Sequence, residues 1–492
     1  MQSSLQADRG RFKSLYFMGI CGIAMGTLAA MLKDEGYDVL GSDTHVYPPM
    51  STFLAEKSIP ILPGWDPRNL EVAKPHAVIV GNVIRKDNPE VQRAAQLGLP
   101  LLSMPQALDL FFFPGRKNLV VCGTHGKTTT TGLLGWILEQ VGLDPTVFVG
   151  GFVGAWRRSY RTGQGPFMIL EGDEYDTAFF DKHAKFLRYK PWIAVVTSIE
   201  FDHADIYRDV EHVMETFRAL SRLIPPDGFL VIHADDPRCA ELATICPGTV
   251  ITYGTSRQCQ WRLEEVSARN GSVTFAVTSP DGSRHHFSSS LPGRHNALNT
   301  LAAMAVCRLL NVPMEQVREA IRGFGGMKRR QEVIYKANGV VVLDDFAHHP
   351  TAVRETIQAV RAFYAPQRLL AVFEPRTNSS RRRFFQHEYA EAFDEASWVG
   401  IKEPSGFHTI AAEERLDTAE LIGKIQERGI PARLFCEGEP VVPGLLQHIR
   451  SGDLVLLMSN GSMDGVPTGL CQALQEQGKK AHIKAENEKA SQ

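Results

Sequence analysis

One short segment of the sequence constrains the fold more than any other. Residues 118–122 (NLVVC) form an apolar run that leads directly into the glycine turn GTHGKTT at residues 123–129, and helical spacing continues to residue 140. A glycine-rich turn between a strand and a helix offers backbone N–H groups and a positive helix end to an anion. The segment therefore predicts a phosphate site in which Lys127 reaches the β- and γ-phosphates and the Thr128 hydroxyl binds Mg²⁺. Val121 replaces the first glycine of the usual G-x-x-x-x-G-K-S/T pattern, which leaves a plain glycine turn as the alternative.

A second glycine turn opens the chain. An apolar run at residues 14–20, helical spacing at 24–32 and a strand at 37–40 predict a β-α-β unit. Its turn lacks the strict G-x-G-x-x-G fingerprint, because Cys21 and Ala24 occupy glycine positions, whereas Asp43 lies where a dinucleotide fold has its ribose-binding acid. Both a nucleotide diphosphate site and a simple tight turn fit this pattern. Two phosphate-type turns in one chain indicate two nucleotide-bearing ligands and argue against a dehydrogenase.

The length and the recurrence of strand and helix patterns predict three α/β domains, since 492 residues exceed one hydrophobic core. We expect a Rossmann-like domain at 1–115, a central P-loop ATPase-like sheet at 116–325, a Rossmann-like C-terminal domain at 326–480 and a mobile tail at 481–492. Short alternating strands at 250–287 predict a small antiparallel appendix. Further strands are expected at 77–80, 167–170, 193–197, 229–232, 340–344, 369–373, 398–401 and 454–458.

Composition excludes several classes of partner. Lys and Arg number 53 and Asp and Glu number 55, a net charge of −2, so no overall basic field recruits nucleic acid or an anionic membrane. No basic leader with an apolar core and no apolar run of about 20 residues is present, which predicts a cytoplasmic protein. The 8 cysteines are scattered and are expected to be reduced thiols.

Two further segments of the central domain suggest metal ligands. Glu171 follows the apolar run 167–170 and begins the acidic stretch EGDEYD. A carboxylate at a strand's C-terminal end, in the same sheet as a phosphate loop, can hold a metal or order its water, whereas a solvated acidic loop is the alternative. His203 follows the next strand in the same way, and both a structural and a ligand role fit it.

Three segments toward the C-terminus carry further polar side chains. Asn296 and Asn299 share one face of a predicted helix, as nucleotide-site amides or as a satisfied polar face. The stretch DDFAHHP at 344–350 pairs two acids with two histidines, so metal binding and helix capping are both open. The arginine-rich stretch EPRTNSSRRR at 374–383 suits carboxylate recognition, although a solvated basic face is common for such runs.

Taken in order, GTHGKTTTT, LEGDE, SIEFDH, LPGRHNALN and DDFAHHPT resemble the Mur ligase family, the ATP-dependent amide ligases that build the peptide of peptidoglycan precursors. The resemblance covers nearly the whole chain. MGICGIAMG, GSD and GNVIRKDNPE resemble the branch that acts on UDP-N-acetylmuramate. Within that branch, residues 46–52 and 171–186 resemble the recycling members that attach L-alanyl-γ-D-glutamyl-meso-diaminopimelate to this sugar nucleotide. Direct addition of L-alanine is the alternative.

The resemblance implies a role for each matching residue. The implied ATP site consists of Gly123, Thr124, His125, Gly126, Lys127, Thr128, Thr129, Asn296, Asn299, Arg330 and Asp345. The implied catalytic residues are Lys127, Glu171 and His203, and the implied ligands of Mg²⁺ are Thr128, Glu171 and His203. The UDP-sugar site is expected at Gly19, Gly22, Ser42 and Asp43, and the peptide site at Arg376 and His348. The implied partners are UDP-N-acetylmuramate, ATP and the murein tripeptide, with no nucleic acid or membrane, for a monomer or weak homo-oligomer.

One departure from the family pattern concerns the metal site. Several members carry a carbamylated lysine after the histidine motif, but this chain has no lysine between Lys190 and Lys328, and Arg218 lies near the expected position. Two rival functions also follow from single motifs. A dehydrogenase would use the N-terminal turn but leaves the G-K-T segment unexplained. A P-loop switch protein would hydrolyse ATP without needing a sugar nucleotide.

Overall fold

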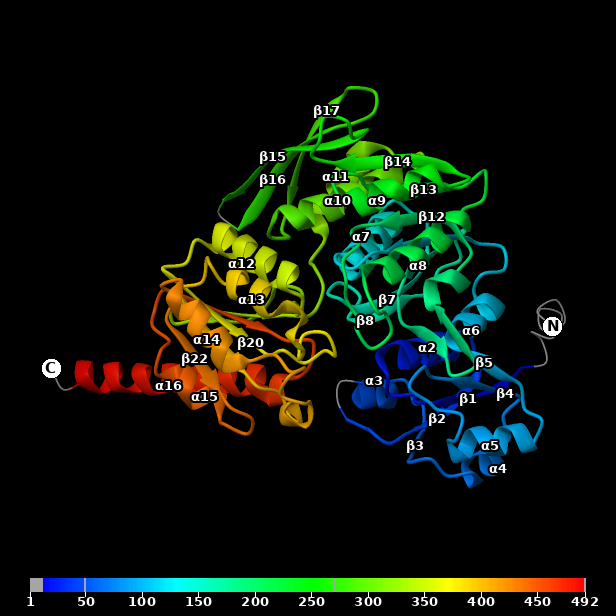
Figure 1. Ribbon diagram of the computed structural model, residues 1–492, viewed down its shortest axis with the longest axis horizontal. Helices are drawn as coiled ribbons and strands as arrows, with labels where there is room; N and C mark the ends of the chain where they lie inside the picture. The colour runs from blue at the N-terminus through cyan, green and yellow to red at the C-terminus, as the bar shows by residue number, and fades with distance from the viewer. Residues whose placement is uncertain (1–11, 48–49, 270, 491–492) are drawn as a thin grey trace.

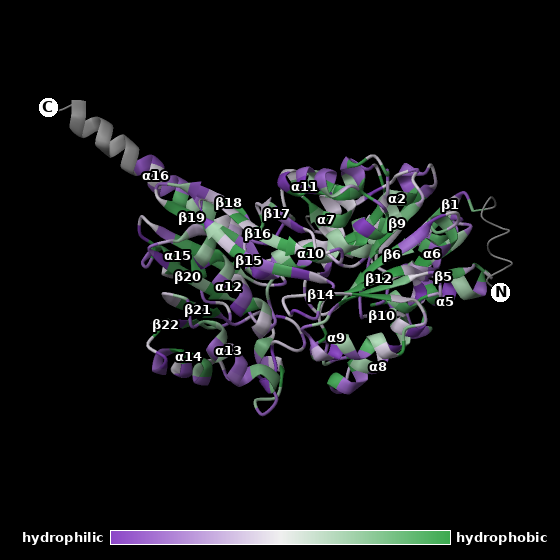
Figure 2. Ribbon diagram, turned by 90° about the horizontal axis from the view of Figure 1, so that it is seen from above, coloured by the Kyte–Doolittle hydropathy of each residue, from purple (hydrophilic) through white to green (hydrophobic). Residues whose placement is uncertain are grey.

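The computed structural model describes residues 12–47, 50–269 and 271–490. Three sheets, each mostly parallel, follow one another along the chain and confirm the three-part α/β architecture (Figure 1). In Figure 2 the hydrophobic residues gather along the strands, while hydrophilic residues dominate the outer faces of the surrounding helices. No helix among the described residues is long and apolar enough to cross a membrane.

The first sheet has the strand order of a dinucleotide-binding fold. It contains β1 (Ser14–Met18), β2 (Asp38–Asp43), β3 (Ile61–Pro63), β4 (Ala77–Val80) and β5 (Leu101–Ser103) in the order β3-β2-β1-β4-β5, all parallel. The helices are α2 (Ile23–Asp34), α3 (Met50–Glu56), α4 (Arg68–Ala73), α5 (Pro89–Gln96) and α6 (Met104–Phe111). The strand order reverses between β1 and β4, and ligands of open α/β sheets bind at such a switch point.

The central sheet has ten strands in the order β17-β16-β15-β14-β13-β12-β6-β9-β7-β8. Their bounds are β6 (Lys117–Cys122), β7 (Thr146–Val153), β8 (Arg158–Arg161), β9 (Phe167–Glu171), β12 (Pro191–Val196), β13 (Phe229–His233), β14 (Thr249–Gly254), β15 (Trp261–Arg269), β16 (Ser272–Thr278) and β17 (Arg284–Ser289). A separate hairpin pairs β10 (Asp176–Ala178) with β11 (Asp181–Ala184). The helices are α7 (Lys127–Gln140), α8 (Val210–Arg222), α9 (Pro237–Glu241), α10 (Arg294–Leu309) and α11 (Met314–Gly323).

The C-terminal sheet has six strands in the order β18-β19-β23-β20-β21-β22. They are β18 (Glu332–Ala337), β19 (Val340–Asp345), β20 (Arg368–Phe373), β21 (Trp398–Lys402), β22 (Ala432–Phe435) and β23 (Asp453–Met458), and only β18 runs antiparallel to its neighbour. The helices are α12 (Pro350–Tyr364), α13 (Gln386–Ala392), α14 (Thr418–Glu427), α15 (Val441–Leu446) and α16 (Val466–Ala490). Helix α16 extends through residue 490 and so includes most of the tail at 481–492, which the sequence predicts to be mobile.

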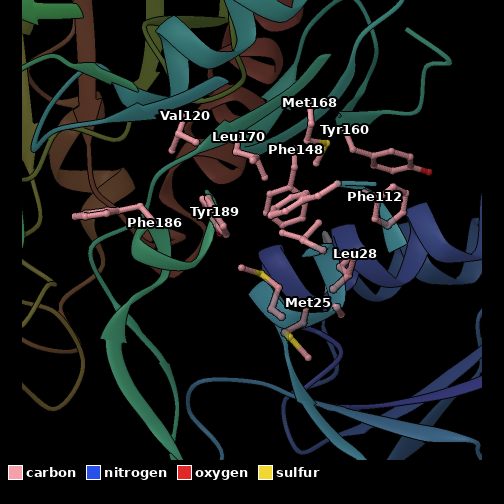
Figure 3. Packing of buried hydrophobic residues seen from close by; sticks show 14 of the residues in the cluster. Met25, Leu28, Phe112, Val120, Phe148, Tyr160, Met168, Leu170, Phe186 and Tyr189 are labelled. Carbon is pink, nitrogen blue, oxygen red and sulfur yellow. The ribbon is translucent and has the colours of Figure 1, made fainter. Parts of the chain in front are cut away.

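The first two sheets share one hydrophobic core. Figure 3 shows Met25 and Leu28 of α2 on one side of a group of buried side chains and Phe148 of β7 and Met168 of β9 on the other, and all four belong to one hydrophobic cluster. Tyr160 of β8 also joins the two parts, because its hydroxyl donates to Asp34 at 2.6 Å. Such continuous apolar burial favours one fixed arrangement of the first and central parts.

The sequence patterns predict the buried strands better than the irregular ones. The expected strands at β4, β6, β9, β12, β13, β19, β20, β21 and β23 are all present. Strand β7 was not predicted, because Gly150 and Gly151 interrupt its apolar run. The predicted antiparallel strands are present as β15 to β17, and they extend the central sheet because β15 also pairs in parallel with β14.

Candidate functional site

The phosphate loop lies where three strand ends meet. Strands β9, β6 and β12 are neighbours, so Glu171, the glycine turn and the segment from Ser198 onward all leave the same edge of the sheet. Gly123 and Gly126 have φ values of 121° and 81°. A Cβ atom on Gly126 would collide with the amide of Asn299, so the turn needs glycine for both its backbone angle and its space.

The backbone amides of the loop divide into two groups. The amides of Thr124 and His125 donate to Ser198, at 2.9 Å to its carbonyl and 3.0 Å to its hydroxyl. The first-turn amides of α7, from Lys127 to Thr129, have no intrahelical acceptor. The donors available for a phosphate are therefore the helix amides, whereas Thr124 and His125 shape the loop.

Lys127 is held in an ion pair that the sequence patterns did not single out. Its ammonium group lies 2.8 Å from Glu174 Oε2 and donates to the Gly123 carbonyl at 2.6 Å. The side chains of Lys127 and Glu174 are only 13% and 4% exposed. Burial alone would lower the pKa of Lys127, but the carboxylates of Glu174, Glu171 and Asp173 together raise that pKa. A triphosphate entering the loop would compete with Glu174 for Lys127.

Thr128, Glu171 and Arg330 meet beside the loop. The Thr128 hydroxyl donates to Glu171 Oε1 at 2.8 Å, and Arg330 Nη2 lies 3.1 Å from that hydroxyl. The other carboxylate oxygen of Glu171 accepts the Gly150 amide at 2.7 Å. A hydroxyl and a carboxylate in contact are the oxygen ligands that magnesium prefers, so these two residues fit a magnesium ion.

His203 takes a different position from these two residues. Its backbone has a φ of 55°, and its ring lies 4.3 Å from the ring of Tyr175. In the described part of the chain it makes no hydrogen bond or ion pair with Thr128 or Glu171. Asp173 is another neighbour: burial tends to raise its pKa, but Lys185 and His203 outweigh burial and lower it to about 2.

Arg218 does not take the place of the lysine that several family members carry. It lies on α8, where its guanidinium pairs with Glu211 and Glu241, the latter at 2.7 Å. The negative charge near His203 comes instead from Asp173, Glu174 and Asp202.

The two asparagines of α10 and Asp345, the last residue of β19, are buried near the loop. Asn299 Nδ2 donates to Asn296 Oδ1 at 3.2 Å, and Asn296 donates to the Pro292 carbonyl at 2.8 Å. Asp345 accepts the Gln331 amide at 2.8 Å and the Ala347 amide at 2.7 Å, so it ties the chain just after Arg330 to the segment that follows β19. Helix capping, one of the two interpretations open from the sequence, holds for His349, which is the N-cap of α12 and accepts the Thr351 amide.

The C-terminal part meets the loop through histidines. His125 Nε2 lies 3.0 Å and His349 Nδ1 lies 3.2 Å from the same oxygen of Glu200, Oε2. Burial lowers the pKa of His349 to about 4. Burial would raise the pKa of Glu200, but its hydrogen bond with His125 and the nearby histidine charges lower it to about 2. His348 lies beside these groups, with Nε2 at 3.5 Å from Asp202.

Two arginines in the loop after β20 have no acidic partner among the described residues. Arg376 is exposed and makes no ion pair among the described residues, and Arg381 donates only to Asn378, at 3.0 Å. The buried Nε of Arg381 has no hydrogen-bond partner. Burial and the charges of Arg382 and Arg376 lower the pKa of Arg381. A carboxylate between Arg376 and Arg381 would satisfy both groups; the sequence run alone did not distinguish Arg381 from its neighbours.

A cavity of about 680 Å³ opens at the switch point of the first sheet. Gly19, Gly22 and Asp43 line it, but Ser42 does not, because its hydroxyl is buried and donates to Glu90 at 2.6 Å. The amides of residues 19–22 are used within the turn, by Ser42, Asp43 and Gly19. The first-turn amides of α2 are therefore the backbone donors left for an anion.

Three family models match the chain in order. They are "Mur ligase family, catalytic domain" at residues 14–112, "Mur ligase middle domain" at 121–307 and "Mur ligase, glutamate ligase domain" at 329–461. The chain belongs to the Mur ligase family. It is therefore an ATP-dependent, amide-forming ligase of peptidoglycan synthesis.

Named relatives of this Mur ligase fall into two groups. It is 37% identical to the UDP-N-acetylmuramate–L-alanyl-γ-D-glutamyl-meso-2,6-diaminoheptandioate ligase of Haemophilus influenzae, over 92% of this chain and 97% of that protein. It is also 32% identical to the UDP-N-acetylmuramate–L-alanine ligase of Caldanaerobacter subterraneus, over 93% and 97%. Among solved structures, the murein peptide ligase of Psychrobacter arcticus matches with a TM-score of 0.70 and 29% identity, over 94% and 98%.

Proposed function

We propose that this Mur ligase joins UDP-N-acetylmuramate to L-alanyl-γ-D-glutamyl-meso-diaminopimelate in peptidoglycan recycling, in the cytoplasm. The observation that carries the proposal is the presence of two separate candidate sites, a cavity at the first switch point and a glycine loop before α7 on the central sheet. The identity of 37% to the Haemophilus influenzae tripeptide ligase supports this peptide. The second candidate is direct addition of L-alanine, which the 32% identity to the Caldanaerobacter subterraneus enzyme supports.

The chemistry follows from the need to activate a carboxylate. The lactyl carboxylate of the sugar nucleotide attacks the γ-phosphorus of ATP, which gives an acyl phosphate and releases ADP. The L-alanyl amine then attacks the acyl carbon, loses a proton, and inorganic phosphate leaves with the electrons of the cleaved C–O bond. Lys127 and the helix amides of α7 stabilise the charge on the transferring group.

The remaining residues position the two reactants. A magnesium ion held by Thr128 and Glu171 would offset negative charge on the phosphates. Arg330, which contacts Thr128 at 3.1 Å, would add a cation on the C-terminal side of the loop. His203 is proposed to complete the metal site, and Asn296, Asn299 and Asp345 are proposed to complete the nucleotide site. Closure of the C-terminal part over ATP would exclude water from the acyl phosphate.

The arginine-rich loop at residues 374–383 is proposed to bind a carboxylate of the peptide, and His348 is proposed as a further residue of the peptide site. We expect Arg376→Gln to raise the KM for the tripeptide about 10- to 100-fold, because a charge-assisted hydrogen bond contributes about 1.5–3 kcal/mol. The KM for ATP should change little. Arg383→Gln is the matched control, since Arg383 lies in the same loop but pairs with Asp417. Equal effects of Arg376→Gln on both KM values would contradict the assignment.

A phosphate-release assay tests the choice of substrate. The protein is given ATP, magnesium and UDP-N-acetylmuramate, with L-alanine in one reaction and the tripeptide in the other. Release with the tripeptide and none with L-alanine supports the proposal. Release with L-alanine alone contradicts it and favours the second candidate.

A further inference from the structure

Three side chains from two parts of the fold converge on one point outside the expected magnesium ligands. His125 comes from the phosphate loop, Glu200 follows β12, and His349 precedes α12 of the C-terminal part. One ligand atom from each residue lies within 4.8 Å of those of the other two. A single oxygen, Glu200 Oε2, lies between the imidazole nitrogens, at 3.0 Å from His125 Nε2 and 3.2 Å from His349 Nδ1.

In either tautomer of His349, at least one buried polar group lacks a suitable hydrogen-bond partner. The Thr351 amide donates to His349 Nδ1 at 3.3 Å, which requires a bare nitrogen facing the Glu200 carboxylate. If Nδ1 instead carries the proton and donates to Glu200, the Thr351 amide loses its acceptor. In both cases His349 Nε2 is buried without a partner, and the residue is only 6% exposed. A cation bound by Nδ1 and Glu200 would take the place of the Thr351 amide on the Nδ1 lone pair and would remove the opposition of two acceptor atoms.

Glu200 is held rigidly in this position. Its backbone amide donates to the Thr124 hydroxyl at 2.8 Å, which fixes the backbone. Its side-chain oxygen Oε1 accepts the Thr351 hydroxyl at 3.2 Å, which fixes the carboxylate. These two hydrogen bonds leave the other oxygen, Oε2, facing the two histidines. Preorganised ligands of this kind lower the cost of binding an ion.

We propose that His125, Glu200 and His349 form a binding site for a divalent transition cation such as Zn²⁺ or Co²⁺. Two imidazoles and one carboxylate are a donor set for these metals, whereas magnesium prefers the oxygen ligands of Thr128 and Glu171. The bound ion fastens the phosphate loop to the N-terminus of α12. It therefore stabilises the contact between the central and C-terminal parts.

Titration of the full-length, ATP-free protein with Co²⁺ and with Zn²⁺ tests the site. The ligand-field absorption of Co²⁺ and the heat of Zn²⁺ binding report occupancy without relying on enzyme activity. We expect one ion per chain to bind to these ligands in the unmodified protein. His349→Asn and Glu200→Gln should each weaken binding of the ion at least about tenfold, the size of effect seen when a metal site loses a ligand or a residue that orients a ligand. Asn keeps an acceptor at the helix N-cap, and Gln keeps an acceptor for Thr351.

The matched control is His183→Asn. His183 also lies beside a carboxylate, at 2.8 Å from Asp181, but has no second histidine there. Binding should be unchanged in this variant, and a large excess of Mg²⁺ should not displace Co²⁺. If thermal unfolding shows that His349→Asn or Glu200→Gln does not fold, His125→Asn is tested in place of that variant. The proposal is overturned if the ligand variants bind like the unmodified protein, if the control loses the ion equally, or if Mg²⁺ displaces it.

Discussion

Replacement of Lys127 by methionine should lower the rate of ligation by about 10³-fold or more, the scale on which a cation or donor that stabilises the transferring phosphoryl group contributes. The reason is that Lys127 is the cation at the start of α7, directly beside the helix amides that are free to bind phosphate. The measurement is phosphate release under saturating substrates. A rate within tenfold of the unmodified enzyme would remove Lys127 from the phosphate site.

The same substitution should also reduce stability, because Lys127 neutralises a buried acid. Without the ammonium group, Glu174 is left 4% exposed with no cation in contact, a situation that costs about 3–5 kcal/mol when a buried pair is broken. The double variant Lys127→Met, Glu174→Gln separates the two effects. It should recover most of the stability in a denaturant titration while remaining inactive. Recovery of activity in the double variant would contradict the assigned role.

Replacement of Lys402 by methionine should destabilise the C-terminal sheet by about 3–5 kcal/mol. Lys402 ends β21 and lies 2.8 Å from Glu374 Oε1, and Glu374 is fully buried at the end of β20. Ser459 donates to the other oxygen of Glu374 at 2.6 Å, but a neutral hydroxyl does not replace the lost charge. Hydrogen exchange of the β20, β21 and β23 amides measures the free energy of opening.

Lys190→Met is the control for this prediction. Lys190 pairs with Asp109 at 2.6 Å, but its side chain is 54% exposed, and exposed pairs contribute only about 0–1 kcal/mol. Opening of the sheet should be unaffected in this variant. An equally small effect of Lys402→Met would mean that the buried pair contributes no more than a surface one.

The buried strands and the phosphate loop were predictable because their signals are local. Apolar runs such as residues 118–122 predict β6, and the glycine turn before Lys127 predicts the loop and α7. Strand β8 could not be predicted in this way, because its residues RSYR carry no apolar run and its place depends on pairing with β7.

Contacts between distant segments were the part that the sequence could not provide. Glu174 stands in an acidic run whose pattern does not tell a buried member from a solvated one, and only the fold brings it to Lys127, 47 residues away. Glu200 and His349 likewise meet across 149 residues, the difference between their numbers. Ser42 shows the opposite error, since it is adjacent to Asp43 in sequence but its side chain points to Glu90 instead of the cavity.

The transfer of an oxygen atom tests the central claim most directly. UDP-N-acetylmuramate labelled with oxygen-18 in its lactyl carboxylate is incubated with the protein, ATP, magnesium and the tripeptide, and the released phosphate is analysed by mass spectrometry. If the carboxylate attacks the γ-phosphate, one labelled oxygen passes from the sugar nucleotide into inorganic phosphate. Phosphate released without the label, while the amide product forms, would contradict the account.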